Sequence, residues 1–140
     1  MKFISRKEYH AKKGKKVFGK DDCPFCYDDE FLIWTGKYWK IFHNKSSYSG
    51  DERNLLAVPK RHIIYSTDLK KEEFEELAEV HKFMKKFFGE ENYFSFTRET
   101  MGSRSVEHLH IHFLAGRLQG KFLRKMLEGQ GFPIEEDLKI

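Results

Sequence analysis

The chain of 140 residues has few of the features that mark cross-linked or membrane-spanning proteins. Its only two cysteines, Cys23 and Cys26, lie too close together in the sequence for a disulfide between them to cross-link distant parts of the fold. No apolar run approaches the roughly 18 residues that a membrane helix needs, and residues 1–7 lack the apolar core of a signal peptide. These absences argue against a disulfide-stabilised secreted scaffold and predict a cytoplasmic protein without a membrane span.

Acidic residues are almost missing from the first twenty positions, where eight Lys and Arg side chains stand against Glu8 alone. This segment has a net charge of +7, whereas residues 21–140 sum to −3. A basic arm of this kind can bind a polyanion such as nucleic acid, or it can be a solubilising, partly disordered extension. We therefore expect a basic N-terminal extension over residues 1–20 and one domain over residues 21–140.

Histidines occupy alternate positions of one short stretch, as His108, His110 and His112. Bulky apolar residues separate and follow them, namely Leu109, Ile111 and Phe113. Side chains two positions apart share a face of a strand, so the pattern predicts a strand over residues 105–114 with the imidazoles on one face. The outer two imidazoles would be roughly 13 Å apart, too far to share one metal ion with the middle one. A purely structural role, in which the imidazoles only satisfy hydrogen bonds, is the alternative.

The two cysteines form a Cys-x-x-Cys motif, Cys23-Pro24-Phe25-Cys26. Such a motif can be a redox pair, half of a tetrahedral zinc site, or two spectator thiols. A redox pair follows an apolar strand, whereas this motif follows a lysine-rich segment and has five carboxylates nearby, which disfavour a thiolate. The motif therefore favours zinc, with two further ligands from elsewhere in the chain.

The rest of the pattern predicts an α+β domain. Apolar residues recur at helical spacing between Asp68 and Gly89, and a short amphipathic helix is predicted over residues 121–127. Apolar and aromatic clusters bounded by turn residues predict further strands over residues 31–35, 38–43, 55–58 and 93–97. Strands, a crossing helix and more strands are typical of an antiparallel sheet with a helix on one face.

The segment His108 to Leu114 reads His-x-His-x-His followed by two apolar residues, and Ser105 precedes it by three positions. In these features the chain resembles the histidine triad family of nucleotidyl hydrolases and transferases. The resemblance runs from about Cys23 to Gly116. It implies a HIT-like fold, with a five-stranded antiparallel sheet, one long helix and a sheet that often pairs in a homodimer.

The resemblance also implies roles for single residues. His110 matches the nucleophile that attacks an α-phosphate and becomes a nucleotidyl-histidine, while His112 and Ser105 match positions that hold the phosphate oxygens. Asn44 falls where many members place a side chain on the ribose. The residue types suit this chemistry, because a neutral imidazole is a ready nucleophile near pH 7 and later a good leaving group.

Zinc-containing members of the family hold the metal with a Cys-x-x-Cys, a histidine soon after a strand-ending proline, and the first histidine of the triad. The matching residues here are Cys23, Cys26, His62 and His108. We therefore expect one tetrahedral Zn²⁺ with four protein ligands. Such closed coordination is typical of a structural site.

Two positions depart from the family pattern. Asn54 stands where many relatives have a histidine, and Arg104 stands where a glutamine is usual. Arg104 can clamp a more anionic substrate or point to solvent, and Arg98 is a second candidate for stabilising phosphate charge. A histidine rather than a glutamine at position 112 favours hydrolysis over hexose-phosphate transfer.

The expected function is a nucleotide hydrolase or nucleotidyl transferase that acts on a dinucleoside polyphosphate or a nucleoside phosphoramidate. A nucleic-acid processing enzyme that removes adenylate or a cap from an end is one alternative, and the basic N-terminal residues are its local support. A zinc-stabilised nucleotide-binding module without turnover is another.

Overall fold

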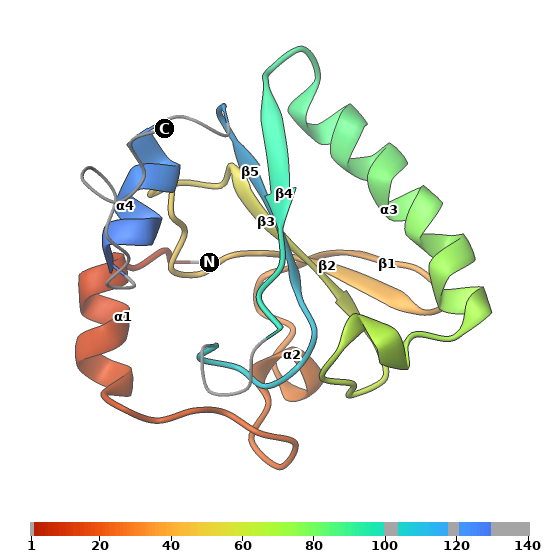
Figure 1. Ribbon diagram of the computed structural model, residues 1–140, viewed down its shortest axis with the longest axis horizontal. Coiled ribbons are helices and arrows are strands. Elements are labelled where there is room, and N and C mark those ends of the chain that lie inside the picture. The colour runs from red at the N-terminus through yellow and green to blue at the C-terminus, as the bar shows by residue number, and fades with distance from the viewer. Residues whose placement is uncertain (1, 100–103, 118–120, 130–140) are drawn as a thin grey trace, which may run out of the picture.

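The fold is built on a five-stranded sheet, as the computed structural model shows for residues 2–99, 104–117 and 121–129 (Figure 1). The strand order is β1-β2-β3-β5-β4, and every neighbouring pair is antiparallel. The strands are β1 (Leu32–Thr35), β2 (Trp39–His43), β3 (Asn54–Pro59), β4 (Tyr93–Phe96) and β5 (Ile111–Ala115). This confirms the predicted α+β class and the five-stranded antiparallel sheet.

The long predicted helix is present as α3 (Lys71–Phe88). It begins later than Asp68 because Ser66–Asp68 forms a 3₁₀ turn, and it ends at Gly89, which adopts a φ of 64°. The other helices are α1 (Arg6–Lys13), α2 (Pro24–Tyr27) and α4 (Lys121–Gly129), the last close to its predicted range. No described helix combines the length and the apolar character that a membrane span requires.

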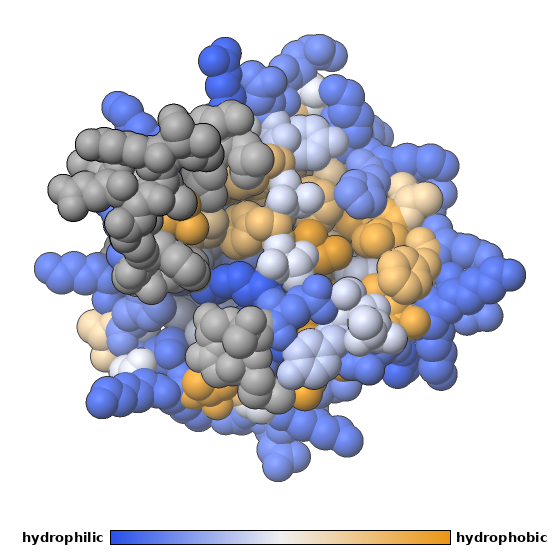
Figure 2. All heavy atoms as spheres, in the orientation of Figure 1, coloured by the Kyte–Doolittle hydropathy of each residue, from blue (hydrophilic) through white to orange (hydrophobic). Residues whose placement is uncertain are grey.

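The main core lies between α3 and one face of the sheet (Figure 1). Its buried residues are Trp39, Ile41, Leu55, Ala57, Val80, Met84, Phe88, Phe113 and Ala115. The Trp39 indole donates a hydrogen bond of 2.8 Å to the carbonyl of Glu73, which ties β2 to the first turn of α3. Hydrophilic side chains ring the outline of the molecule in Figure 2, and apolar ones gather over the sheet and α3.

A second apolar cluster lies on the opposite face of the sheet. Its buried members are Phe31, Phe42, Leu56 and Val58. Phe25 of α2 and Phe3 of the N-terminal segment pack against it. Since β3 is the middle strand of five, apolar residues on both of its faces are covered, and all six of its residues are buried.

The predicted strand over residues 105–114 is too long at its start. Regular pairing begins only at Ile111, opposite Ala57, and the residues before it bond elsewhere. The Leu109 amide, for example, donates to the carbonyl of Ile63 at 2.7 Å. Within the regular strand the predicted alternation is kept, because Phe113 packs toward α3 and His112 faces the other side.

The N-terminal residues pack against the rest of the chain on both sides of α1. The Ile4 amide donates to the carbonyl of Lys45 at 3.0 Å. Phe18 forms a bridge with Val106, and the Phe18 amide donates to the carbonyl of Ser105 at 2.9 Å. These bonds attach α1 to the loops before β3 and β5, while the proposed boundary at residue 20 stays a prediction.

The carboxylate of Glu73, at the start of α3, is nearly fully buried. It accepts hydrogen bonds from the Arg61 guanidinium at 2.7 and 3.1 Å and from the Lys70 amide at 2.7 Å. The hydrogen bonds from Arg61 lower the pKa of Glu73 from its usual 4.5, and they outweigh the effect of burial. The ionised form is therefore the one that the folded state favours.

We expect Glu73→Gln to reduce the free energy of unfolding by about 1–2 kcal/mol at pH 7. Because the folded-state pKa is lowered, the carboxylate contributes fully above about pH 4.5, and this contribution disappears as the pH falls through the folded value. The difference in the free energy of unfolding between wild type and variant, measured by urea titration, should thus become smaller as the pH is lowered from 7 to about 3. Glu72→Gln, at an exposed neighbouring position, is the control. Equal losses in the two variants would contradict the prediction.

Candidate functional site

Four potential metal ligands come together beside α2. Cys23 precedes α2 and Cys26 lies within it, while His62 follows β3 and His108 precedes β5. The ligand atoms of these four residues all lie within 4.8 Å of one another. The His108 Nδ1 is 3.3 Å from Cys23 Sγ and 3.5 Å from Cys26 Sγ, and Cys26 Sγ is 3.4 Å from His62 Nδ1. Ligands on a tetrahedral Zn²⁺, with Zn–S of about 2.3 Å and Zn–N of about 2.0 Å, would stand about 3.5 Å apart. The four residues therefore fit a tetrahedral metal ion.

Neighbouring backbone groups hold these ligands in place. Pro24 begins the α2 turn, and the Cys26 amide donates to the carbonyl of Cys23 at 3.1 Å. His108 Nε2 lies 2.8 Å from the carbonyl oxygen of Pro59. A carbonyl cannot donate, so Nε2 carries the proton and the Nδ1 lone pair faces the sulfurs. The last residue of β3 thus sets the tautomer that a metal needs.

Burial affects the charge of these groups in the metal-free chain. It raises the pKa of Cys23 to about 12 and lowers the pKa of His108 to about 4. It also lowers the pKa of His62, against a hydrogen bond with the backbone of Glu107. Two neutral imidazoles are ready to bind a cation, which would displace the thiol protons.

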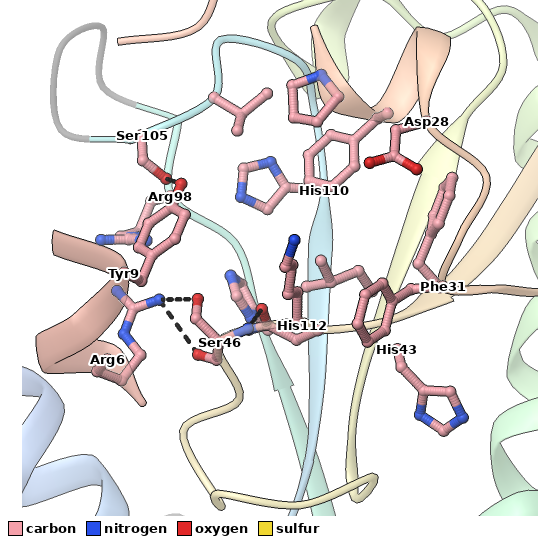
Figure 3. Close-up of a pocket in the computed structure, with 17 residues that line it drawn as sticks. Arg6, Tyr9, Asp28, Phe31, His43, Ser46, Arg98, Ser105, His110 and His112 are labelled. Atoms are coloured by element: carbon pink, nitrogen blue, oxygen red, sulfur yellow. Dashed lines mark hydrogen bonds between the residues drawn. The ribbon is translucent and has the colours of Figure 1, made fainter. Parts of the chain in front are cut away.

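A cavity of about 130 Å³ lies next to this cluster, on the side of the sheet opposite α3 (Figure 3). Phe31, Phe42 and Leu56 of the second apolar cluster form part of its wall. The predicted site residues that line it are Asn44, Arg98, Ser105, His110 and His112. The structure therefore brings together residues that are up to 68 positions apart in the sequence.

His110 has one ring nitrogen committed and one available. Its Nδ1 lies 2.6 Å from the carbonyl oxygen of His108, which can only accept, so Nδ1 carries the proton. The unprotonated Nε2 is left for the cavity that the ring lines. Burial lowers the pKa of His110 to about 4, so the ring is neutral at pH 7. This is the form of imidazole that can attack an electrophile.

His112 lacks hydrogen-bond partners within the described part of the chain. Its ring stacks on Phe96 of β4, with centroids 4.5 Å apart and planes 4° apart, and both ring nitrogens are buried. Burial also lowers the pKa of His112 well below its usual value. Buried polar atoms are rarely left without a partner, so a neutral imidazole at a cavity wall suits a ligand that accepts its N–H.

Two further residues are held at the cavity by hydrogen bonds. The Tyr9 hydroxyl lies 3.1 Å from Ser105 Oγ, and both residues line the cavity (Figure 3). The Asn44 amide nitrogen donates to Asn54 Oδ1 at 2.9 Å. The departure at Asn54 therefore has a physical role, because its side chain fixes the orientation of Asn44.

Arg104 is placed differently from the expectation that it binds substrate. It does not line the cavity, and only 2% of it is exposed. Its guanidinium pairs with Glu107 at 2.9 Å and donates to the carbonyl of Ile64 at 2.8 Å. These contacts give Arg104 a structural role, since they join the loop before β5 to the loop after β3. Arg98, in contrast, lines the cavity as expected.

Sequence reasoning missed most of the residues that line the cavity, among them Arg6 and Tyr9 of α1, and Lys45. A signal for α1 was present in the sequence. Ser5 is followed three positions later by Glu8, the pattern that begins many helices, and the Glu8 amide indeed donates to Ser5 Oγ at 3.0 Å. The pattern predicts a helix, but not the site that it would contact.

The sequence model of one family, described as scavenger mRNA decapping enzyme C-term binding, matches residues 12–127. An uncharacterized HIT-like protein from Chlamydia muridarum (strain MoPn / Nigg) is 39% identical over 109 residues, which cover 74% of this chain and 79% of the relative. Its counterpart in Chlamydia trachomatis serovar D is 40% identical over 109 residues, or 74% of this chain and 90% of that protein.

Solved structures agree on the fold. A HIT family hydrolase from Legionella pneumophila Philadelphia 1 has a TM-score of 0.51 at 25% identity, covering 71% of this chain and 96% of that one. A Zn-bound histidine triad family protein from Mycobacterium smegmatis has a TM-score of 0.58 at 18% identity, covering 73% and 80%. With most of the chain matched in sequence and its sheet matched in structure, the protein belongs to the histidine triad family.

Proposed function

We propose that this protein is a nucleotide hydrolase or nucleotidyl transferase that uses His110 as its nucleophile. The observation that carries the proposal is the fixed tautomer of His110, whose Nδ1 proton is held by the carbonyl of His108. The other nitrogen is then a permanent lone pair at a cavity with anion-binding side chains. Membership of a family that includes hydrolases supports the same reaction class.

The proposed reaction has two steps at the α-phosphorus of a nucleotide. First, a bond forms between His110 Nε2 and phosphorus while the bond from phosphorus to the leaving group breaks, and the leaving group departs with the electron pair. A water molecule then attacks the nucleotidyl-histidine, the P–N bond breaks, and a nucleoside monophosphate and neutral imidazole result. Another acceptor in place of water would give transfer.

The other side chains would position the phosphate and stabilise its charge. His112 and Ser105 can donate hydrogen bonds to phosphate oxygens, and Arg98 can offset the negative charge. Asn44, oriented by Asn54, would contact the ribose. The substrates that fit this arrangement are dinucleoside polyphosphates and nucleoside phosphoramidates.

We also propose that the metal cluster holds one structural Zn²⁺. The donors are Cys23, Cys26, His62 and His108, and a four-ligand site leaves no open position for substrate. When bound, the ion would supply cross-linking between α2, the loop after β3 and the start of the histidine segment. A homodimer and a cytoplasmic location stay part of the proposal.

Removal of an adenylate or a cap from a nucleic-acid end is a second candidate function. The matching family model is described by a decapping enzyme, and residues 1–20 have a net charge of +7. Arg6 and Lys45 add positive charge at the cavity itself. A nucleic-acid substrate would approach along this basic side of the molecule.

Wild-type protein should release nucleoside monophosphate from a dinucleoside polyphosphate or a nucleoside phosphoramidate, with kcat/KM in the range of about 10⁴ M⁻¹ s⁻¹ or higher. Chromatography of the products from both compounds and from a short capped RNA would measure this. Faster release from capped RNA than from free nucleotides, together with a strong decrease in RNA affinity with rising salt, would favour the second candidate. Nucleotide binding without any product would contradict both candidates and indicate a binding module.

A further inference from the structure

The cavity contains an arginine that comes from outside the histidine segment. Arg6, in the first turn of α1, lines the cavity together with Tyr9 (Figure 3). Backbone bonds on both sides of α1 attach this helix to the loops that carry Ser46 and Ser105. The position of Arg6 is therefore set by the fold and does not depend on a free N-terminal arm.

The contacts of Arg6 are all with neutral groups. Its Nη1 donates to Ser46 Oγ at 3.0 Å, its Nη2 lies 3.0 Å from His10 Nε2, and its guanidinium carbon lies 4.4 Å from the centre of the Tyr48 ring. Within the described residues it forms no ion pair. Four other arginines pair with carboxylates, namely Arg53, Arg61, Arg104 and Arg124. Arg6 thus brings an uncompensated charge to the cavity.

The surroundings of Arg6 indicate where an anion would lie. The Tyr48 ring that faces Arg6 also lies 5.5 Å from the ring of His112, so the guanidinium is one aromatic side chain away from a proposed phosphate-binding imidazole. Lys45 and Arg98 line the same cavity, and Asp28 is the one carboxylate among its described lining residues. The proposed function assigns Ser105, His112 and Arg98 to the α-phosphate, whereas Arg6 and Lys45 have no part in it.

We propose that Arg6 binds a second phosphate group, so that the preferred substrate is a nucleotide with at least two linked phosphates. This rests on the proposed function, since the α-phosphate is taken to lie at His110. A guanidinium is suited to this task because its N–H groups can bind two phosphate oxygens at once. In the reaction, attack at the α-phosphorus breaks the bond to the bridging oxygen, and this oxygen keeps the electron pair and departs with the neighbouring phosphate, which Arg6 contacts.

The test compares a substrate with one phosphate and a substrate with three linked phosphates that share the same base. For wild type, Arg6→Gln and Arg6→Lys, kcat/KM is measured on a dinucleoside triphosphate and on a nucleoside phosphoramidate. The ratio of interest is kcat/KM on the dinucleoside triphosphate divided by kcat/KM on the phosphoramidate. Loss of one charge-assisted contact should lower this ratio by about 10- to 100-fold in Arg6→Gln, with partial recovery in Arg6→Lys. Lys7→Gln removes the same charge from the adjacent, exposed position of α1 and should keep the wild-type ratio. An unchanged ratio in Arg6→Gln, or an equal change in Lys7→Gln, would overturn the inference.

A binding measurement separates this inference from the proposed reaction. Titration calorimetry with ADP and AMP should show tighter binding of ADP to wild type, and Arg6→Gln should reduce that preference by about 10-fold or more. If wild type turns over neither substrate but keeps an Arg6-dependent preference for ADP, the catalytic proposal fails and the role of Arg6 stands. If wild type binds the two nucleotides equally, the role of Arg6 is rejected.

Melting temperatures of Arg6→Gln and Lys7→Gln report whether α1 stays packed. Arg6→Lys is the variant used for the test if Arg6→Gln is unstable.

Discussion

His110→Asn is expected to lower kcat by at least about 1,000-fold on the best substrate, with little change in folding or metal content. The reason is the geometry at this ring, which lines the cavity and donates its Nδ1 proton to the His108 carbonyl, so that its second nitrogen keeps a lone pair. Asparagine can keep a hydrogen bond to that carbonyl, but it has no nucleophilic lone pair. Steady-state rates and zinc content per chain measure the two halves of the prediction.

The control for this variant is His81→Asn, an exposed histidine on α3 that does not line the cavity. It should keep the wild-type rate. Acid quenching with a labelled nucleotide should trap label on wild type and on His81→Asn, but not on His110→Asn. Near wild-type turnover by His110→Asn would rule out the covalent route, and the histidine segment would then be a binding surface.

His108→Ala is expected to lose metal and stability together. The His108 imidazole approaches both cysteine sulfurs and also donates to the carbonyl of Pro59, so its removal opens the four-ligand cluster and leaves a buried carbonyl without its partner. Loss of a structural metal should reduce the free energy of unfolding by about 3 kcal/mol or more, which corresponds to a fall in Tm of roughly 10 °C. Elemental analysis and thermal unfolding check the two effects.

Chelation should reproduce the effect in the wild-type protein. Treatment with a strong zinc chelator should lower the Tm of wild type toward that of His108→Ala, and it should not change the Tm of the variant. His81→Ala, outside the cluster, should behave as wild type does. Protein purified without chelator that contains less than about half an equivalent of zinc would contradict the proposed centre.

The sequence predicted the sheet well, because alternation and apolar runs reflect burial directly. It did not predict where the histidine strand begins, since this depends on its partner. Pairing with β3 starts at Ala57 opposite Ile111, and the backbone before Ile111 bonds to other loops. A residue pattern shows which face of a strand is buried, but not where the neighbouring strand is available.

The site was only partly predicted, because local patterns in the sequence do not show which distant residues come together. The histidines and cysteines carry strong local patterns, and the structure places His108 with Cys23 as a metal site would require. Arg6 has no such pattern, because its closeness to the cavity follows from packing between residues about a hundred positions apart. The charge of Arg104 suggests a contact with an anionic substrate, but in the fold Glu107, three positions later, is its partner in a buried ion pair.

Strand β3 separates two parts of the site by a fixed length. Its first residue, Asn54, orients Asn44 on one side of the cavity, and its last, Pro59, fixes the tautomer of His108 at the metal cluster. Six residues in extended form place these ends about 16 Å apart, and the strand has bonded neighbours on both sides. An inserted residue would shift one end by about 3.3 Å and turn its side chain to the other face. The length of β3 therefore sets the distance between the proposed ribose contact at Asn44 and the proposed metal site at His108.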